Sequence, residues 1–313
     1  MRIYLLLASL IENQKMIQKK KTKEGFFLRE EKTAWIFILP LILYFFSLMI
    51  YPFINGIFIS LTRKLVGFPP IFVGLGNYID LLHDWVFHRV VRNSFIYTFG
   101  AVSIKLGLGM IMALSLSRGV RGLRFFRGFF LLPWITPTVV AGLIWVWIFQ
   151  GEVGFLNITL MSLKIIKEQI PWLAVPNLAL FAVIVANVWR GFPFFGVSLL
   201  AGMQSIPDEY YEAAKIDGAS AAQRFFHITL PLIRPVIMVC SLISIVRTFN
   251  DFNLVWIMTR GGPARSTHIF ATYTYETGFL SFQWGRAMAI SIYITPLLIV
   301  AIILLSRYLL KER

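Results

Sequence analysis

The chain has 313 residues, of which 58% are hydrophobic and 14% are charged, and its formal net charge is +15. Soluble domains carry roughly 25% charged residues, and a soluble protein of this size could not hide so much apolar surface. The composition therefore argues against a soluble protein with a very apolar core and indicates a membrane protein. The single cysteine, Cys240, excludes an internal disulfide.

Residues 1–33 are predicted to form a basic cytoplasmic tail, and residues 34–313 a membrane domain whose core covers residues 93–310. A short apolar stretch lies within Met1–Leu10, but the Lys run follows it, whereas a signal peptide has its basic residues first. These residues are interpreted as a tail or an overextended start. We expect translation to begin at Met1 or at Met16, which mass analysis of the native N-terminus would distinguish.

Six segments are apolar over the roughly 20 residues that a membrane helix needs. They are Ala34–Leu61, Ser94–Leu116, Phe129–Phe149, Leu178–Leu200, Val236–Met258 and Ala287–Leu309. Four of them contain proline, and these prolines include Pro40, Pro52, Pro137, Pro193 and Pro296. Such breaks are tolerated where neighbouring helices or a lined cavity satisfy the freed carbonyls. The pattern predicts an all-α polytopic protein with six transmembrane helices that enclose a pathway.

The basic residues are distributed unevenly between the two sides of these segments. Of the 30 Lys and Arg residues, 18 lie on the side of both termini and of the loop between the fourth and fifth segments, and nine lie opposite. The other three, Lys105, Arg190 and Arg247, lie within segments. Because Lys and Arg concentrate in cytoplasmic loops, both termini and that loop are predicted to be cytoplasmic. Because the basic residues lie at the ends of apolar segments, we interpret them as membrane-orientation signals rather than as a nucleic-acid-binding surface.

The cytoplasmic loop, residues 205–231, is predicted to contain two short helices. Ser205 is expected to cap the first, which runs over Asp208–Ile216 and stops at Gly218. The second begins near Ala219 and is expected to end at Leu230-Pro231. These signals alone leave open an amphipathic helix that lies on the membrane without a partner.

A sequence frame runs through this loop: E-A-A, three residues, Gly, nine residues, then I-x-L-P. It resembles the EAA loop of binding-protein-dependent ABC importer permeases, which docks on the ATPase. The resemblance implies an ATPase-coupling role for Glu212, Ala213, Ala214, Asp217, Gly218, Ile228, Leu230 and Pro231. Ala222 departs from the family, since many relatives carry Trp there.

Three further stretches extend the resemblance over nearly the whole chain after the tail: F-V-G-L-G-N-Y at 72–78, N-V-W-R-G-F-P-F at 187–194, and N-D-F at 250–252 with M-T-R-G-G-P at 258–263. They are similar to the first permease subunit of carbohydrate importers of the maltose and glycerol-3-phosphate type. The large periplasmic insertion and extra N-terminal spans of the maltose-type subunit have no counterpart in this sequence.

The resemblance implies a type I ABC importer permease in a bacterial or archaeal cytoplasmic membrane. Its expected partners are a second homologous permease, two ATP-binding subunits and an extracytoplasmic solute-binding protein. No cofactor is expected on this chain, because ATP and Mg would bind the ATPase. Closure of the ATPase would rock the spans between inward- and outward-facing states.

Polar residues near the middle of the spans are candidates for the pathway, because such groups usually face the bundle interior or water. Ser244, Arg247, Thr248 and Asp251 fall on one face at 100° per residue. Two alternatives are open: a helix–helix interface held by polar contacts, and an ion pair of Asp251 with Arg190 or Arg247.

The resemblance places eight residues along the substrate pathway: Trp134, Thr138, Arg190, Gly191, Phe194, Ser244, Thr248 and Asp251. An aromatic plate with hydroxyl groups suits a sugar, since rings stack on C–H faces and hydroxyls need partners. Trp134 alone would more often be a packing residue. Arg190, Thr248 and Asp251 differ from the residues of the maltose-type subunit, so the sugar itself is not predicted.

Catalytic chemistry is not predicted. The sequence contains no G-x-x-x-x-G-K-[ST] loop for phosphates, and its four histidines, His83, His88, His227 and His268, lack metal-ligand spacing. Two other classes of membrane protein fit the sequence less well. An ion-driven secondary transporter would show inverted repeats and intramembrane acids, but Asp251 is the only acidic residue in the predicted spans. A polytopic enzyme would show clustered catalytic groups at one face, and the sequence indicates none. A permease for glycerol-3-phosphate or another small solute also fits the frame.

Overall fold

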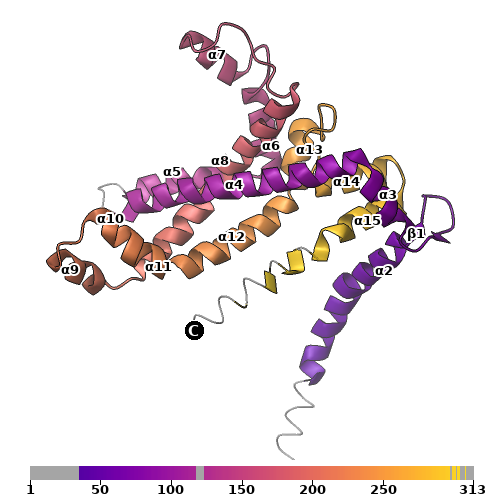
Figure 1. The fold of residues 1–313 in the computed structure, drawn as a ribbon, viewed down its shortest axis with the longest axis horizontal. Coiled ribbons are helices and arrows are strands. Elements are labelled where there is room, and N and C mark those ends of the chain that lie inside the picture. The colour runs from indigo at the N-terminus through magenta and orange to yellow at the C-terminus, as the bar shows by residue number, and fades with distance from the viewer. Residues whose placement is uncertain (1–34, 118–122, 297, 301, 304–306, 308–313) are drawn as a thin grey trace, which may run out of the picture. The chain divides into compact units, whose positions relative to one another are not determined.

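The computed structural model describes residues 35–117, 123–296, 298–300, 302–303 and 307, and these residues are mostly helical (Figure 1). The chain divides into two units, Met1–Phe58 and Ile59–Arg313, which we describe separately. The predicted tail, its boundary at residue 34 and the choice between Met1 and Met16 lie outside the described residues.

The first predicted span is an apolar helix over Trp35–Ser60. Its middle is a π-helical stretch, η1 (Phe46–Ile50), and its end is α2 (Tyr51–Ser60). Pro40 and Pro52 lie inside it without ending it. The π-helical turn directly before Pro52 shifts the hydrogen-bond register, which accommodates a residue that lacks an N–H.

A short hairpin follows, in which β1 (Thr62–Arg63) pairs antiparallel with β2 (Ile71–Phe72). Thr62 lies opposite Phe72, and Arg63 lies opposite Ile71. Helix α3 (Gly76–His83) comes next. The buried Asn77 amide donates to the carbonyls of Ser60 and Thr62, at 2.8 and 2.9 Å. The 72–78 stretch therefore has a structural role, because Asn77 joins the hairpin to the end of α2.

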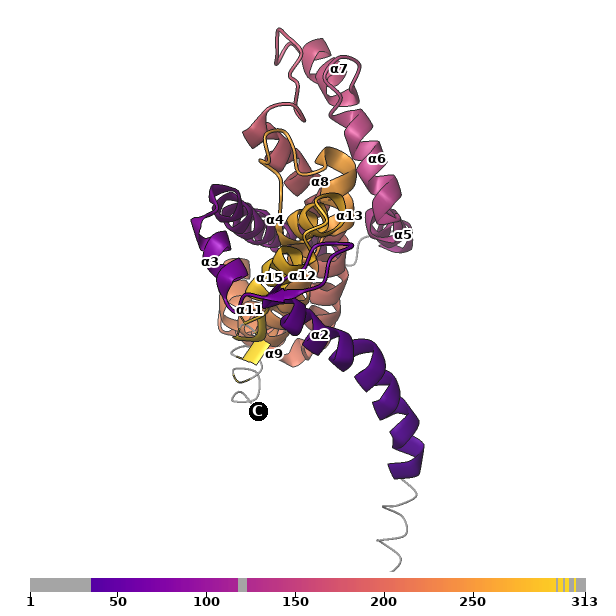
Figure 2. The same cartoon turned by 90° about the vertical axis from the view of Figure 1, so that its right-hand side faces the viewer.

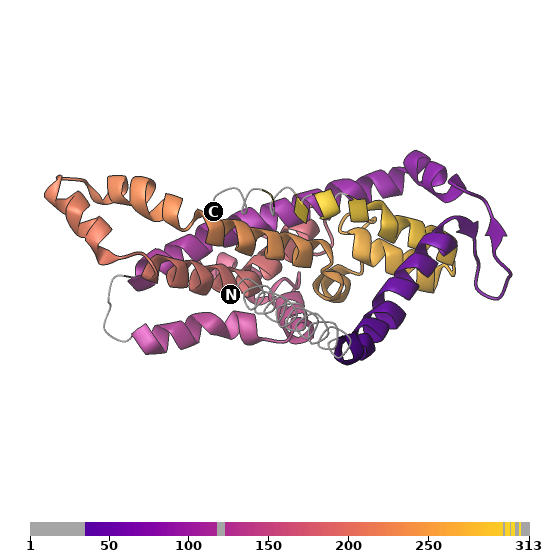
Figure 3. The same cartoon turned by 90° about the horizontal axis from the view of Figure 1, so that it is seen from below.

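Two long helices, α4 (Trp85–Ser117) and α8 (Pro176–Gln204), run side by side through the second unit (Figures 1 and 3). They contain the second and fourth predicted spans. Helix α4 begins nine residues earlier than predicted, where the Asp84 carboxylate accepts a hydrogen bond from the Val86 amide at 2.8 Å. The helices touch through glycines: Gly109 faces the backbone of Phe195 and Gly196, and Gly196 faces the Met112 side chain.

The third predicted span is not one straight helix. Helices α5 (Leu123–Ile135) and α6 (Thr138–Ile148) are bent by 97° at a break that includes Pro137. Helix α7 (Phe155–Ser162) follows α6, as Figure 2 shows. The buried Asn157 amide holds this connection together by donating to the carbonyls of Gly151 and Ile170, at 2.6 and 2.9 Å.

The loop predicted to be cytoplasmic contains α9 (Asp208–Ile216), α10 (Ala221–Arg224), η2 (Phe225–Thr229) and α11 (Leu230–Leu232). The fifth predicted span is broken into α12 (Arg234–Phe249) and α13 (Phe252–Thr259). The chain continues through α14 (Phe270–Tyr275), η3 (Glu276–Leu280) and α15 (Trp284–Tyr293). Helix α15 covers the first part of the sixth predicted span, part of whose remainder lies outside the described residues.

Apolar side chains of α4, α8 and α12 or α13 form the core of the second unit. One cluster includes Met112, Phe195 and Leu199, and another includes Tyr97 and Leu254. Among the described residues, three helices are long and apolar enough to cross a membrane, or up to five if each bent pair is one span. The count of six spans therefore stays a prediction.

The glycine contact between α4 and α8 can be tested with a matched pair of substitutions. In Gly109→Ala the new Cβ would lie 2.4 Å from the Phe195 Cβ and 2.9 Å from the Gly196 nitrogen, so the helices must separate. Overpacking costs about 1–3 kcal/mol, and we expect a thermal unfolding midpoint in detergent several degrees below that of the unsubstituted protein. Gly107→Ala, with nothing within 4 Å, is the control. Equal midpoints would contradict the contact.

Candidate functional site

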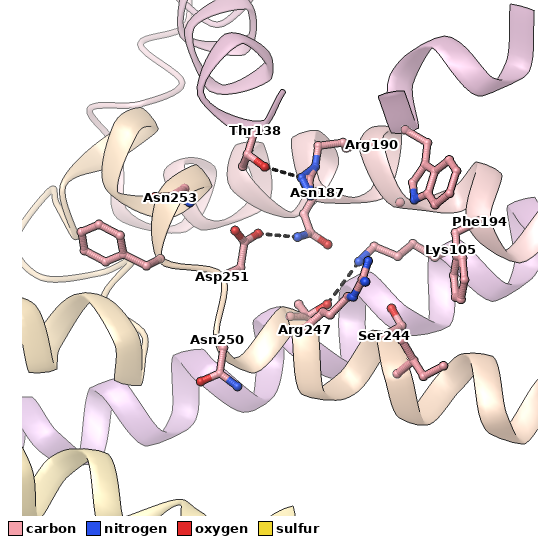
Figure 4. A pocket seen from close by; sticks show the side chains of 15 residues that line it. Lys105, Thr138, Asn187, Arg190, Phe194, Ser244, Arg247, Asn250, Asp251 and Asn253 are labelled. Carbon is pink, nitrogen blue, oxygen red and sulfur yellow. Dashed lines mark hydrogen bonds between the residues drawn. The ribbon is translucent and has the colours of Figure 1, made fainter. Parts of the chain in front are cut away.

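A cavity of ≈ 290 Å³ lies between α4, α5, α6, α8, α12 and α13 (Figure 4). All eight residues predicted for the pathway line it: Trp134, Thr138, Arg190, Gly191, Phe194, Ser244, Thr248 and Asp251. Lys105 and Arg247, the other basic residues within predicted spans, line it as well. Five further lining residues were missed: Asn187, Ile243, Asn250, Phe252 and Asn253. The structure thus brings the predicted set together, while its role in substrate passage stays a prediction.

A helix break brings Asp251 to the cavity. Helix α12 ends at Phe249, and Asp251 is the N-cap of α13, where its Oδ1 accepts from the Leu254 amide at 3.4 Å. The four residues predicted on one helix face therefore divide between a helix and the cap that follows it. They still line the same cavity, because the break turns the chain without moving Asp251 away from it.

The Asp251 carboxylate is held by neutral donors. Its Oδ2 accepts from the Tyr97 hydroxyl at 2.8 Å and from the Asn187 amide at 2.6 Å. No ion pair joins Asp251 to Arg190 or Arg247 in the part of the chain that the structure describes. The predicted alternative of such a pair is therefore wrong, because Asp251 faces α4 and α8 donors instead. Asn187 opens the 187–194 stretch, which was the available signal for it.

The basic side chains come from three different helices. Arg190 of α8 donates from Nη1 to the Thr138 hydroxyl at 2.6 Å. The Lys105 ammonium of α4 donates to the Thr248 hydroxyl at 3.2 Å. The stem of Lys105 passes against Gly191, where a Cβ would lie 2.6 Å from its Cε. Glycine at 191 is thus needed for Lys105 to reach the cavity.

Two aromatic rings form one wall. Trp134 and Phe194 are stacked with their centroids 6.4 Å apart and their planes at 27°. Trp134 therefore packs against a neighbour and also lines the cavity. A ring pair of this kind offers an apolar face, and the hydroxyl, amide and charged groups around it offer hydrogen bonds.

The second candidate site is the predicted coupling loop, residues 205–231. Helix α9 has the predicted bounds and no buried residue, and Figure 3 shows the loop projecting past the ends of α4 and α8. Gly218 has φ +77°, the left-handed conformation that favours glycine after a helix. A capping box of Ser220 and Gln223 starts α10, and the Tyr211 and Thr229 hydroxyls, 2.9 Å apart, join the two helices.

Two details of the predicted loop are wrong. Ser205 does not cap α9; it ends α8, and its hydroxyl donates back to the Gly202 carbonyl at 2.8 Å, while Pro207 precedes α9. The second helix does not end at Leu230-Pro231 but continues to Leu232. The π-helical η2 before Pro231 accommodates its missing N–H, so the bend of 63° comes after it, at Ile233.

Most predicted coupling residues are accessible. Glu212, Ala213, Asp217, Gly218 and Pro231 are exposed, while Ala214, Ile228 and Leu230 are half-buried.

A shallow groove of ≈ 370 Å³ lies between the helices and is lined by Ala214, Ala219, Gln223, Arg224, His227 and Ile228. Sequence reasoning missed Ile216, whose side chain is 87% exposed at the end of α9. An apolar residue so placed is an available contact for a partner.

The comparison with protein families is decisive for identity. Residues 105–312 match the family described as "Binding-protein-dependent transport system inner membrane component". The chain belongs to this family. Among its members, the trehalose/maltose transport system permease protein MalF of Thermococcus litoralis is 34% identical over 265 residues, which cover 84% of this chain and 89% of that one. The sulfoquinovosyl glycerol transport system permease protein SmoG of Agrobacterium fabrum is 32% identical over 285 residues, which cover 88% of this chain and 91% of that one.

Solved structures agree in fold. A bacterial ABC transporter for import of the acidic polysaccharide alginate matches with a TM-score of 0.77 at 20% identity, over 90% of this chain and 96% of that chain. A bacterial alginate ABC transporter in complex with a periplasmic protein bound to an alginate pentasaccharide gives a TM-score of 0.76 at 20% identity, over 88% of this chain and 93% of that chain. The fold is therefore that of a helical type I ABC importer permease, and the resemblance drawn from the EAA frame is confirmed.

The hydrogen bonds to Asp251 predict unequal effects of two substitutions. Asp251→Leu would leave the Tyr97 and Asn187 donors unsatisfied, at about 1–3 kcal/mol for each buried group, and should lower the thermal unfolding midpoint. Asp251→Asn keeps an acceptor oxygen and should remain near the unsubstituted protein. If both substitutions lowered the midpoint equally, the charge of Asp251, rather than its hydrogen bonds, would be the stabilising feature.

Proposed function

We propose that this chain is a permease subunit of an ATP-driven importer for a sugar or oligosaccharide. The observation that carries the proposal is the cavity between the membrane helices, which combines stacked aromatic rings with hydroxyl, amide and charged groups. Such a site is costly in a membrane unless polar solutes use it. The names of the two relatives, which concern trehalose, maltose and sulfoquinovosyl glycerol, support a sugar.

The cytoplasmic loop would couple this cavity to ATP hydrolysis on a separate subunit. Its exposed α9, with acidic Glu212 and Asp217 beside the apolar Ile216, has the composition of a docking surface. Small residues at Ala213 and Ala214 would let the ATPase approach the backbone closely. ATP and Mg would bind the ATPase, and this chain would perform no chemistry itself.

The arrangement in the membrane follows from the charge distribution. Six spans would place both termini and the loop in the cytoplasm, where the proposed ATPase pair would bind. A second homologous permease would complete the pathway, and an extracytoplasmic solute-binding protein would deliver the sugar from the other side. Membership in a binding-protein-dependent family supports that last partner.

Reconstitution tests the function directly. Sugar uptake into proteoliposomes should require ATP, the binding protein, the second permease and the ATPase, because this chain supplies only part of the pathway. Omission of any one component should abolish uptake. Uptake by this chain alone, driven by a proton or sodium gradient, would instead support a secondary transporter and refute the proposal.

The coupling role predicts a defect without loss of insertion. Gly218→Pro should disrupt the loop, because proline cannot adopt the φ of +77° found there. Glu212→Lys should reverse a charge on the exposed face of α9. Both variants should reach the membrane at normal levels but lose ATP-driven uptake. Gly218→Asn is the matched control, since asparagine tolerates the left-handed region and should retain most uptake. Unchanged uptake in both test variants would count against docking.

A further inference from the structure

The charges around the cavity are unbalanced. Three basic side chains line it, Lys105, Arg190 and Arg247, against one acidic side chain, Asp251. The three enter from different helices, α4, α8 and α12, as Figure 4 shows. An excess of positive charge at a site enclosed by membrane helices is costly unless an anion neutralises it.

The protein itself does little to satisfy these cations. Asp251 accepts from Tyr97, Asn187 and the Leu254 amide, so its carboxylate is committed to neutral donors. Lys105 has three N–H donors and Arg190 has five, yet each donates one hydrogen bond to a described residue, to Thr248 and Thr138 respectively. Arg247 donates none to the residues that the structure describes. Most of the donor capacity is left for another molecule.

The surrounding helices determine the position of Lys105 in this site. It is 5% exposed, and its passage to the cavity depends on the absence of a side chain at Gly191. A neutral acceptor lies nearby: Asn187 is 8% exposed and lines the cavity, and its side-chain Oδ1 has no hydrogen-bond partner in the described residues. The site thus offers charged donors for an anion and a neutral acceptor for a hydroxyl.

We infer that the cavity takes a sugar that carries an anionic group, a carboxylate, sulfonate or phosphate, and that Lys105 sets this preference together with Arg190 and Arg247. This inference rests on the proposed function and specifies its substrate class. Charge-assisted hydrogen bonds from ammonium and guanidinium groups would hold the anion, while Trp134 and Phe194 would cover an apolar face of the ring.

The test uses the whole importer, with its second permease, ATPase and binding protein, in proteoliposomes. A panel of labelled neutral sugars and their uronate, sulfonate and phosphate counterparts is offered under ATP. The anionic members should be transported in preference to the neutral ones, and their ranking identifies the anionic group. Lys105→Met, which keeps an apolar stem over Gly191, should reduce uptake of the anionic sugar by about tenfold to a hundredfold.

The control removes one positive charge elsewhere. Lys167 is exposed in the connection between α7 and α8, and Lys167→Gln should leave uptake unchanged. Preferential uptake of neutral sugars, unaffected by Lys105→Met, would overturn the charge assignment and leave the proposed function intact. Loss of the second permease from purified Lys105→Met complexes would also overturn it, because Lys105 would then pair with an acid of that subunit. Transport of no sugar would overturn both proposals.

Discussion

The structure depends on one constraint: a polar group between membrane helices needs a partner, in the protein or in a molecule that occupies its cavity. Asp251 meets it by accepting from Tyr97 of α4, from Asn187 of α8 and from the amide of Leu254 in the first turn of α13. One carboxylate thus joins three helices at the point where a fourth, α12, has ended. The break exposes backbone groups, and the same side chain that caps the new helix also fixes its position against the bundle.

That arrangement explains why the cavity lies where it does. Helix breaks at Pro137 and at Asn250-Asp251 interrupt two neighbouring elements. Each break prevents close packing and leaves space, and the polar side chains next to the breaks line the cavity that results. The packing is tight elsewhere: Gly109 and Gly196 let α4 and α8 approach closely. Close contact on one side and interrupted helices on the other give a bundle with a polar interior.

Local signals in the sequence predicted local structure well. Pro207 and Gly218 bracket α9, and its bounds were predicted correctly because a proline and a positive-φ glycine act through their own backbone. Eight of the residues lining the cavity were also predicted, through spacing and family resemblance. Asn187 and Tyr97 as partners of Asp251 were not, because those contacts join residues 64 and 154 positions apart. The sequence of the fifth predicted span also does not indicate its break. Asn250 and Asp251 fit the pattern of a continuing helix, and only tertiary packing ends the helix there.

Helix α8 connects the two candidate sites without interruption, from Arg190 at the cavity to Gln204 beside the loop. Those 14 residues span roughly 21 Å at 1.5 Å per residue, so α8 would act as a lever if its outer end carries the proposed coupling surface. Pro193 lies within one turn of Arg190 and deprives the lever of a backbone hydrogen bond there. In the proposed importer, force applied at the loop end of α8 would therefore bend the helix beside the cavity wall, where a small change of angle would alter the width of the cavity.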